Sequence, residues 1–294
     1  MAMTGATGLR GLLRGEAMVV APGAYDGLTA KLVAQAGFPA VYMTGAGTSV
    51  SHGYPDFGLL TMSEMVGNAA RIVRAVDVPV IADADTGYGN ELNVFRTVQE
   101  YQQRGVAAIH IEDQVSPKKC GHLDDKEIVP LDDYVAKIRA AVAAKKGEFL
   151  IIARTDARAV AGMDEAVARA NAALAAGADM AFVEAPQTID ELAAVPKLVR
   201  GPCLLNVVRG GKTPEIDLHR AQAMGYRLAI VPGLLLKAVI GACDEVLASL
   251  KAHHIHPVPR TDMTVREAFN RVGAEEWDAL RTRFRDADER RAAE

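Results

Sequence analysis

The sequence predicts an α/β fold, a single (β/α)8 TIM barrel, and three observations support this prediction. Eight short apolar runs recur at intervals of roughly 20 to 40 residues, each followed by a segment with helical periodicity. The runs are continuously apolar, which indicates strands buried on both faces, as in a parallel sheet. Eight such units in about 250 residues match the size of a TIM barrel. An open Rossmann sheet is the alternative, but no G-x-G-x-x-G fingerprint follows a strand.

The elements alternate regularly along the chain. The expected strands are residues 17–23, 40–45, 79–85, 108–113, 149–155, 180–185, 203–208 and 228–233. The amphipathic segments between them are expected to be helices, among them 26–37, 93–105, 131–147 and 163–177. Several of these segments end in Gly, which tolerates the left-handed conformation that closes a helix.

The C-terminal part of the chain has no strand of its own to pack on. We expect a long helix over residues 233–254, a connection rich in Pro and His, and a charged helix from about Val265 to Arg291. No linker divides the chain. We therefore predict one domain over residues 1–294, with the barrel at about 17–254 and a helical extension at 255–294. The extension is expected on an outer surface or against a neighbouring subunit.

Composition narrows the function classes. The net charge of −4 argues against a nucleic-acid-binding protein, which normally carries a basic face. No signal peptide is evident, and Lys237 and Asp244 interrupt the most apolar late segment, so we expect no membrane span. Three cysteines are too few for a disulfide framework and favour the cytoplasm.

Polar residues cluster where the expected strands end, and in a TIM barrel these ends form the active site. Asp83 and Asp85 lie two residues apart and are expected on one face of a strand. With Glu112 from the next strand, these oxygens would suit Mg²⁺, or Mn²⁺, better than zinc. The alternative is a helix-capping acid beside a buried ion pair.

Two further groups are candidates for binding a carboxylate. Arg154 and Asn206 could orient one, Arg154 through its bidentate guanidinium, although Arg154 could also pair with Asp156 or Glu184. The backbone N–H groups of residues 44–46 (TGA) form a plausible anion nest at a tight turn.

The loop PKKCGH is the least expected feature, because it places a rare cysteine between cations. Lys118, Lys119 and His122 would stabilise a reactive Cys120 thiolate, whereas a surface cysteine is the alternative. Residues 114–127 are longer than a usual βα loop, as active-site lids tend to be. Zinc binding would need more Cys or His at ligand spacing.

These motifs resemble a known family. The segments ADADTGYGN, HIEDQVSPKKCGH, IIARTDA and FVEAP are similar to signature segments of the isocitrate lyase/phosphoenolpyruvate mutase superfamily, over roughly residues 10–250. Within it the chain resembles the 2-methylisocitrate lyase and 2,3-dimethylmalate lyase branch. The resemblance implies a Mg²⁺-dependent (β/α)8 barrel that assembles as a tetramer and exchanges its last barrel helix between subunits.

The resemblance also implies residue roles. Asp83 and Asp85 would hold Mg²⁺, with Glu112 acting mostly through water. Cys120 would be the proton donor, Arg154 would contact the oxygen that develops charge, and Tyr42 and His122 would act beside them. The implied substrate-binding residues are Thr44, Gly45, Ala46, Asp56, Lys118, Gly121, Glu184 and Asn206.

The implied reaction cleaves the C2–C3 bond of a 2-hydroxydicarboxylate to a 2-oxoacid such as pyruvate and a carboxylate. The loop NVVRGGKTP, and Lys237 where methylisocitrate lyases tend to have Arg, depart from that branch, although Arg266 could serve a distal carboxylate. These departures favour a smaller substituted malate or the oxaloacetate-hydrolysing relatives. A phosphonopyruvate-type enzyme and a non-catalytic dicarboxylate-binding barrel are the remaining alternatives.

Overall fold

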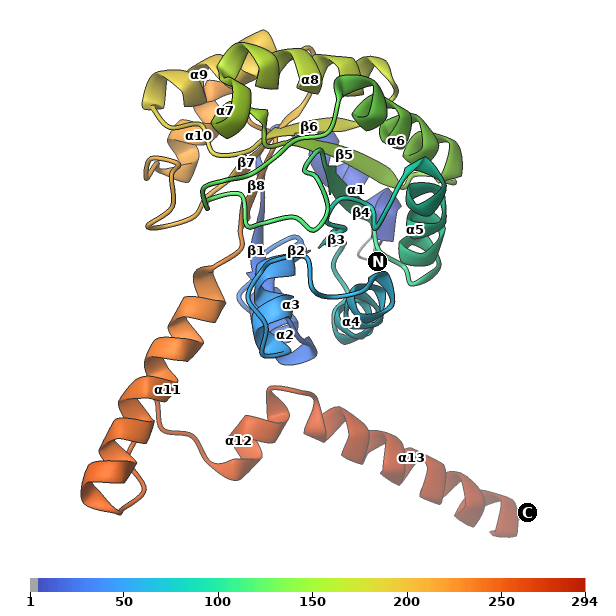
Figure 1. Ribbon diagram of the computed structural model, residues 1–294. Coiled ribbons are helices and arrows are strands. Elements are labelled where there is room, and N and C mark those ends of the chain that lie inside the picture. Colours follow the sequence, from blue (N-terminus) through green and yellow to red (C-terminus); the bar gives the residue numbers. More distant parts are fainter. Residues whose placement is uncertain (1–4, 294) are drawn as a thin grey trace. The chain divides into compact units, whose positions relative to one another are not determined.

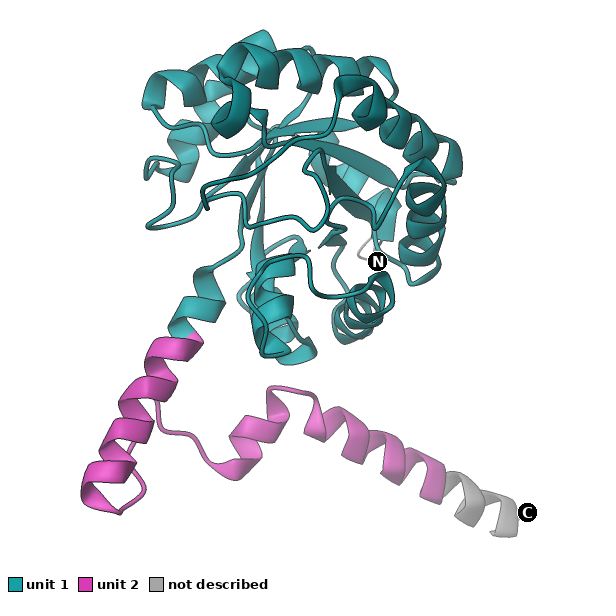
Figure 2. Cartoon of the chain, viewed as in Figure 1, with its two compact units in different colours: residues 1–238 teal, residues 239–294 magenta. Residues whose placement is uncertain are grey.

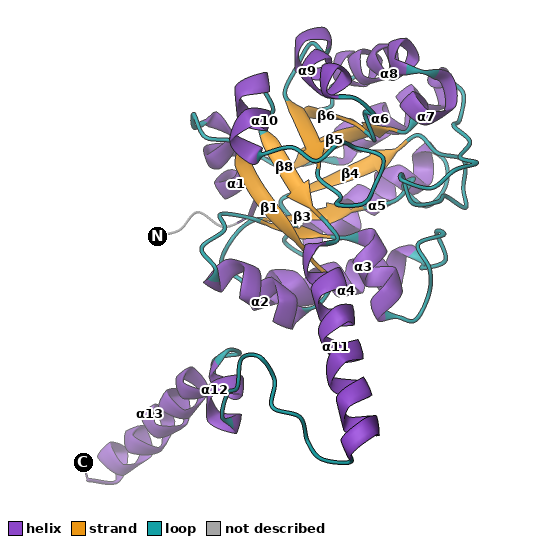
Figure 3. Cartoon of the chain, turned by 90° about the vertical axis from the view of Figure 1, so that its left-hand side faces the viewer, coloured by secondary structure: helices purple, strands orange, loops and turns teal. Residues whose placement is uncertain are grey.

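Eight parallel strands close into a barrel in the computed structural model, which describes residues 5–293 and the side chains of residues 5–285 (Figures 1 and 3). β8 pairs back onto β1, with Val19 opposite Leu228. The predicted barrel is therefore confirmed. The strands are β1 (Val19–Ala24), β2 (Val41–Met43), β3 (Val80–Asp83), β4 (Ala108–Glu112), β5 (Leu150–Thr155), β6 (Met180–Val183), β7 (Cys203–Asn206) and β8 (Leu228–Val231).

Helices surround these strands (Figure 1). They are α1 (Gly5–Arg14), α2 (Gly27–Gln35), α3 (Gly45–Ser51), α4 (Met62–Ala75), α5 (Glu91–Gln103), α6 (Leu131–Ala144), α7 (Ala157–Ala161), α8 (Met163–Ala175), α9 (Ile189–Leu198) and α10 (Leu218–Met224), and α11 (Leu234–His253) follows β8 in the chain. Capping residues fix several helix starts: the Thr61 side chain accepts from the Glu64 N–H, and Glu64 bonds back to the Thr61 N–H. The short helices α3 and α7 follow strand ends and were not expected from the sequence.

The amino-terminal end of the barrel is covered by α1. Leu9 is fully buried in the same apolar cluster as Val19 and Leu228 from the strand starts, and Leu12 and Leu13 pack against this cluster. Burying a leucine side chain contributes about 1.5–3 kcal/mol, so α1 adds appreciably to stability at this end. The carboxyl ends of the strands, at the opposite end, carry the polar residues.

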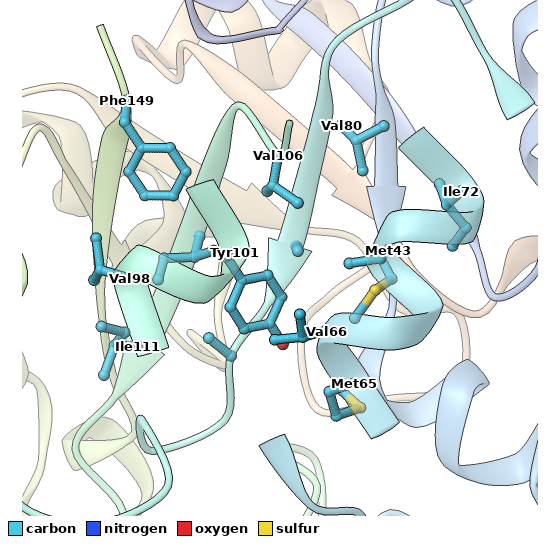
Figure 4. Close-up of a cluster of buried hydrophobic side chains, with 14 of the residues drawn as sticks. Met43, Met65, Val66, Ile72, Val80, Val98, Tyr101, Val106, Ile111 and Phe149 are labelled. Carbon is cyan, nitrogen blue, oxygen red and sulfur yellow. The ribbon is translucent and has the colours of Figure 1, made fainter. Parts of the chain in front are cut away.

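A second apolar cluster lies between the barrel and helices α4 and α5 (Figure 4). Tyr101 of α5 is fully buried there, among Met65 and Val66 of α4 and Ile111 of β4. Its hydroxyl donates to the Asp83 carbonyl at 2.8 Å. A buried hydroxyl needs such a partner, and this bond ties the carboxyl end of β3 to the packed core.

The chain divides into two compact units, residues 1–238 and 239–294 (Figure 2). The second contains most of α11, α12 (Val265–Asn270) and α13 (Ala274–Ala293). The expected continuous helix from Val265 to Arg291 was wrong, because Gly273 adopts φ 91° and interrupts it. The single-domain boundaries and the exchange of the long helix stay predictions. In the described part of the chain no helix combines the length and apolarity needed to cross a membrane.

Candidate active site

A cavity of about 170 Å³ lies at the carboxyl ends of the strands. It is lined by strand-end residues, by the segment between β4 and α6 and by the start of α11: Tyr42, Thr44, Ala46, Asp56, Asp83, Cys120, Gly121, His122, Arg154, Phe182, Glu184, Asn206, Val208, Pro232, Gly233, Leu236 and Lys237. The structure thus brings most of the predicted site residues to one cavity. The apolar wall formed by Phe182, Val208, Pro232 and Leu236 was not expected.

Asp83 is held in a network of backbone donors at the end of β3. Its two carboxylate oxygens accept from the Gly45 N–H at 3.2 Å and the Asp85 N–H at 3.0 Å. A Cβ on Gly45 would lie 2.4 Å from the Asp83 carboxylate, so only glycine permits this approach. The expectation that Asp83 and Asp85 share one strand face was wrong, because β3 ends at Asp83 and Asp85 has φ 45°. Such a conformation is uncommon outside glycine and clusters at functional sites.

Lys118 is buried among acids. Its ammonium lies 2.6 Å from Asp56 and 3.0 Å from Asp85. Burial raises the pKa of Asp85 to about 6, helped by Asp83 and opposed by Lys118. Burial would lower the pKa of Lys118, but Asp85 and Asp56 raise it well above its ordinary value. The predicted substrate-binding lysine is therefore charged and already paired with two carboxylates.

His110 is a site residue that the sequence reasoning missed. Its Nε2 lies 2.8 Å from the Tyr42 hydroxyl, which is 3.3 Å from Asp83 Oδ2. Burial lowers the pKa of His110 to about 4, against the opposing effect of Asp83, so the ring is neutral. The available signal was a polar residue two positions before Glu112, which places both on the inward face of β4.

Asp83, Asp85 and Glu112 are buried carboxylates, which supply the hard oxygen ligands that a divalent cation such as Mg²⁺ prefers. Both Glu112 side-chain oxygens lack a hydrogen bond from the described residues, and burial raises the pKa of Glu112 well above its ordinary value, against Arg154. Within the described residues, no three Asp, Glu, His or Cys side chains lie close enough to share one ion. Two acids with Glu112 acting through water remain compatible with Mg²⁺, which usually keeps several waters.

Arg154, at the end of β5, forms ion pairs with three carboxylates. Its guanidinium lies 2.9 Å from Asp156, 3.1 Å from Glu112 and 3.4 Å from Glu184. Its Cζ also lies 5.2 Å from the centre of the Phe182 ring, within cation–π range. The ion pairs left open by the sequence are thus both present, and they hold the side chain at the cavity wall.

His122 is oriented by the loop after β7. Its Nδ1 accepts from the Lys212 N–H at 3.0 Å, which leaves the proton on Nε2, 3.5 Å from Glu184. Burial lowers the pKa of His122, while Glu184 opposes the shift. Glu184 in turn accepts from the Asn206 amide at 3.0 Å.

Cys120 lies in the lid, which we define as residues 114–127. Its N–H donates to the Asp56 carbonyl at 3.1 Å. Burial and the nearby Asp56 raise the pKa of the thiol, so the expected thiolate stabilised by cations was wrong. Lys118 pairs with acids, and Lys119 donates to the Asp125 carbonyl at 3.2 Å. The thiol therefore stays protonated, the state that a proton donor requires.

Gly121 brings the lid against the arginine. A Cβ at this position would lie 2.5 Å from Arg154 and 2.6 Å from Glu184, so a larger residue would force the lid away. The fold and site together define a (β/α)8 barrel with a cavity at the carboxyl ends of its strands, lined by acids, Arg154 and the Cys120 thiol of the lid.

Comparison with known proteins identifies the family. The phosphoenolpyruvate phosphomutase family model matches residues 9–251, and the chain belongs to this family. It is 49% identical to 2,3-dimethylmalate lyase of Eubacterium barkeri, over 85% of this chain and 87% of that protein. It is 44% identical to 2-methylisocitrate lyase of Aeropyrum pernix, over 82% and 78% of the two chains.

A solved structure extends the comparison. Oxaloacetate acetylhydrolase bound to the inhibitor 3,3-difluorooxalacetate superposes with a TM-score of 0.91 and 38% identity, over 94% of this chain and 95% of that chain. The predicted superfamily is confirmed. The predicted enzyme class, a carbon–carbon lyase, is also confirmed by the lyase relatives.

Proposed function

We propose that this protein is a Mg²⁺-dependent lyase that cleaves a 2-hydroxydicarboxylate of the 2,3-dimethylmalate or 2-methylisocitrate type. The products would be a 2-oxoacid such as pyruvate and a second carboxylate. One observation carries the proposal: the Cys120 thiol, with its raised pKa, lines the same cavity as Arg154, Asp83 and Glu184. The size of the cavity, about 170 Å³, suits a small acid.

The residues have complementary tasks in this reaction. Thr44, Gly45 and Ala46, at the start of α3, would bind the carboxylate next to C2. Arg154 would stabilise charge on the C2 oxygen, a preorganised electrostatic effect. Glu184, Asn206 and His122 would orient the rest of the substrate. Mg²⁺ on Asp83 and Asp85, or Mn²⁺ in its place, would supply Lewis-acid stabilisation of the oxoacid.

Bond cleavage needs a proton at C3. The O–H electron pair becomes the second C–O bond at C2, and the C2–C3 pair moves onto C3 and its carboxylate. Cys120 then transfers its thiol proton to C3 as general acid. The hydroxyl proton leaves to solvent as the C2 carbonyl forms, and solvent returns one proton to the Cys120 thiolate, so the cycle consumes no proton overall.

Oxaloacetate hydrolysis is the second candidate. It is favoured by the contact between Lys212, in the RGGKT loop, and His122 of the lid, and by the likeness to oxaloacetate acetylhydrolase. Here water would add across the C2–C3 bond and release oxalate and acetate. The same cavity would hold a smaller substrate.

The deciding experiment measures 2-oxoacid release with Mg²⁺ from 2,3-dimethylmalate, 2-ethyl-3-methylmalate, 2-methylisocitrate and isocitrate, with oxaloacetate as the hydrolysis substrate. Pyruvate from a substituted malate or from 2-methylisocitrate supports the lyase. Oxalate and acetate from oxaloacetate alone would replace it with the hydrolase. Phosphonate formed from phosphoenolpyruvate would indicate phosphonopyruvate-type chemistry. Saturable binding without turnover of any acid would indicate a dicarboxylate-binding barrel.

We also propose that the protein assembles as a homotetramer that exchanges α11. Large apolar side chains are exposed in the unit of residues 239–294, among them Val258 (81%), Val265 (74%) and Trp277 (72%). Side chains of this kind mark interaction surfaces when they gather. Light scattering on the purified protein should give four times the chain mass, and a monomer would contradict the proposal.

A further inference from the structure

Lys126 is a buried lysine in an otherwise exposed stretch of the lid. Its side chain is 1% exposed, whereas the flanking Asp125 and Glu127 are exposed. Taking an ammonium group out of water is unfavourable unless it gains charged or polar partners. The burial of Lys126 therefore depends on specific bonds.

Its ammonium makes two bonds that join the lid to the barrel. It donates to the carbonyl of Gly121, the residue after Cys120, and to Asp156 Oδ1 at 2.7 Å. Asp156 follows β5, so the second bond crosses from the lid to the barrel wall. One side chain thus fixes the lid segment beside the thiol and anchors it to the barrel.

Asp156 also holds Arg154. The guanidinium donates through Nε to Oδ2 at 2.9 Å and through Nη2 to Oδ1 at 3.2 Å. The Asp156 N–H donates to Asp113 Oδ1 at 2.8 Å, which fixes the backbone from behind. Burial would raise the pKa of Asp156, but Arg154 and Lys126 lower it, so the carboxylate stays charged.

We propose that Lys126 is a positioning residue that latches the closed lid and thereby sets Cys120 against the Arg154 side of the cavity. Opening separates Lys126 from Asp156, but Arg154 still pairs with the carboxylate. The open state therefore leaves no buried charge without a partner, and the latch is reversible. The inference rests on the proposed function only for the identity of Cys120 as proton donor.

The test measures the alkylation rate of Cys120 by iodoacetamide in the full-length protein without substrate, with peptide mass spectrometry. Rates are taken at the pH plateau, so that a change in thiol pKa does not contribute. In the native protein Cys120 is only partly buried, and the latch should slow its alkylation further. Lys126→Met should raise this rate about tenfold or more, the change expected when about 1.4 kcal/mol of closing free energy is lost.

The matched control is Lys119→Met, which removes the same charge from the same lid but leaves the bond to Asp156. Its alkylation rate should stay within about twofold of the native rate. The buried Cys203 reports unfolding and should remain unmodified. Should Lys126→Met expose Cys203, the milder Lys126→Gln repeats the test.

An unchanged Cys120 rate with Cys203 protected would overturn the latch. Exposure of Cys203 in both Lys126→Met and Lys126→Gln would also overturn the latch, because Lys126 would then support the fold as a whole. The measurement needs no substrate, so it is separate from the lyase assay. A native protein inactive on every acid would reject the proposed function while leaving the latch result standing.

Discussion

The two sides of the barrel mouth differ in their charge balance. On the side of β2 and β3, which we call the acid side, one ammonium from Lys118 faces three carboxylates, those of Asp56, Asp83 and Asp85. On the side of β5 and β6, the arginine side, two cations, Arg154 and Lys126, face three carboxylates, those of Asp156, Glu184 and Glu112.

The difference indicates what each side lacks. Excess buried negative charge is unfavourable, and it shows in the pKa of Asp85, which burial raises to about 6. The acid side therefore suits an added cation. On the arginine side both cations are paired with carboxylates, and Asp156, Glu112 and Glu184 together hold Arg154 in place.

Cys120 lies between the two sides, and its removal should have the largest effect. Cys120→Ala should lower kcat by up to about 10⁴-fold, because a general acid contributes about 10² to 10⁴. Thermal stability should change little, since the thiol is at the surface of a cavity. Cys243→Ala, which alters a cysteine on α11 that does not line the cavity, is the control. Near-native kcat in a folded Cys120→Ala protein would exclude the proton-donor role.

A substitution on the acid side tests whether these carboxylates bind Mg²⁺. Asp85→Asn should lower kcat about 10³-fold, because metal-ion catalysis supplies several kcal/mol of charge stabilisation. It should also abolish the rise in Tm that Mg²⁺ gives the native protein. Asp77→Asn, at an exposed position before β3, should leave both properties unchanged. A full Mg²⁺ shift in Asp85→Asn would remove Asp85 from the metal site.

The same side should show a pH dependence. With a pKa of about 6, Asp85 is ionised above pH 6 and protonated below it. A protonated carboxyl cannot ligate Mg²⁺, so the Mg²⁺-induced rise in Tm should be present above pH 6 and fade as the pH falls through 6. Glu112, whose pKa is also raised, acts in the same direction. An equal Mg²⁺ shift on both sides of pH 6 would contradict this assignment.

The contrast between the two sides also shows which features of the site could be predicted from the sequence and which could not. Strand ends were predictable because apolar runs stop at polar residues, and this located Asp83, Glu112, Arg154 and Glu184. Pairing across loops was not predictable, since it depends on how the lid closes. Lys118 and Lys119 were expected around the thiol, but the closed lid turns Lys118 toward Asp56 and Asp85.

Two residues were missed for different physical reasons. His110 lies inside an apolar strand, where a neutral buried histidine and a functional one have the same local sequence. Lys126 lies in the charged stretch DDKE, which is typical of a solvated loop, and only its bond to Asp156 separates it from its neighbours.

A substitution on the arginine side should lower kcat less than the Asp85→Asn substitution on the acid side. Arg154→Lys keeps one charge but cannot reach Asp156, Glu112 and Glu184 together. Loss of part of this preorganised stabilisation should lower kcat about 10²-fold. The control is Arg158→Lys, which weakens the partly buried ion pair between Arg158 on α7 and Glu191 on α9 and should retain activity. Equal losses in both variants would show that Arg154 acts through stability.

The smallest expected effect is a shift in the pH dependence of Cys120 alkylation. Burial and Asp56 raise the pKa of the thiol, so it holds its proton to a higher pH than an ordinary cysteine. The pH midpoint of Cys120 alkylation should lie above that of an ordinary cysteine, and Asp56→Asn should move it down, because this change removes a negative charge and frees Lys118 from that partner. A midpoint below that of an ordinary cysteine would mean that the cations of the lid do stabilise a thiolate. Cys120 would then be a nucleophile, and the acid side would no longer protect a proton donor.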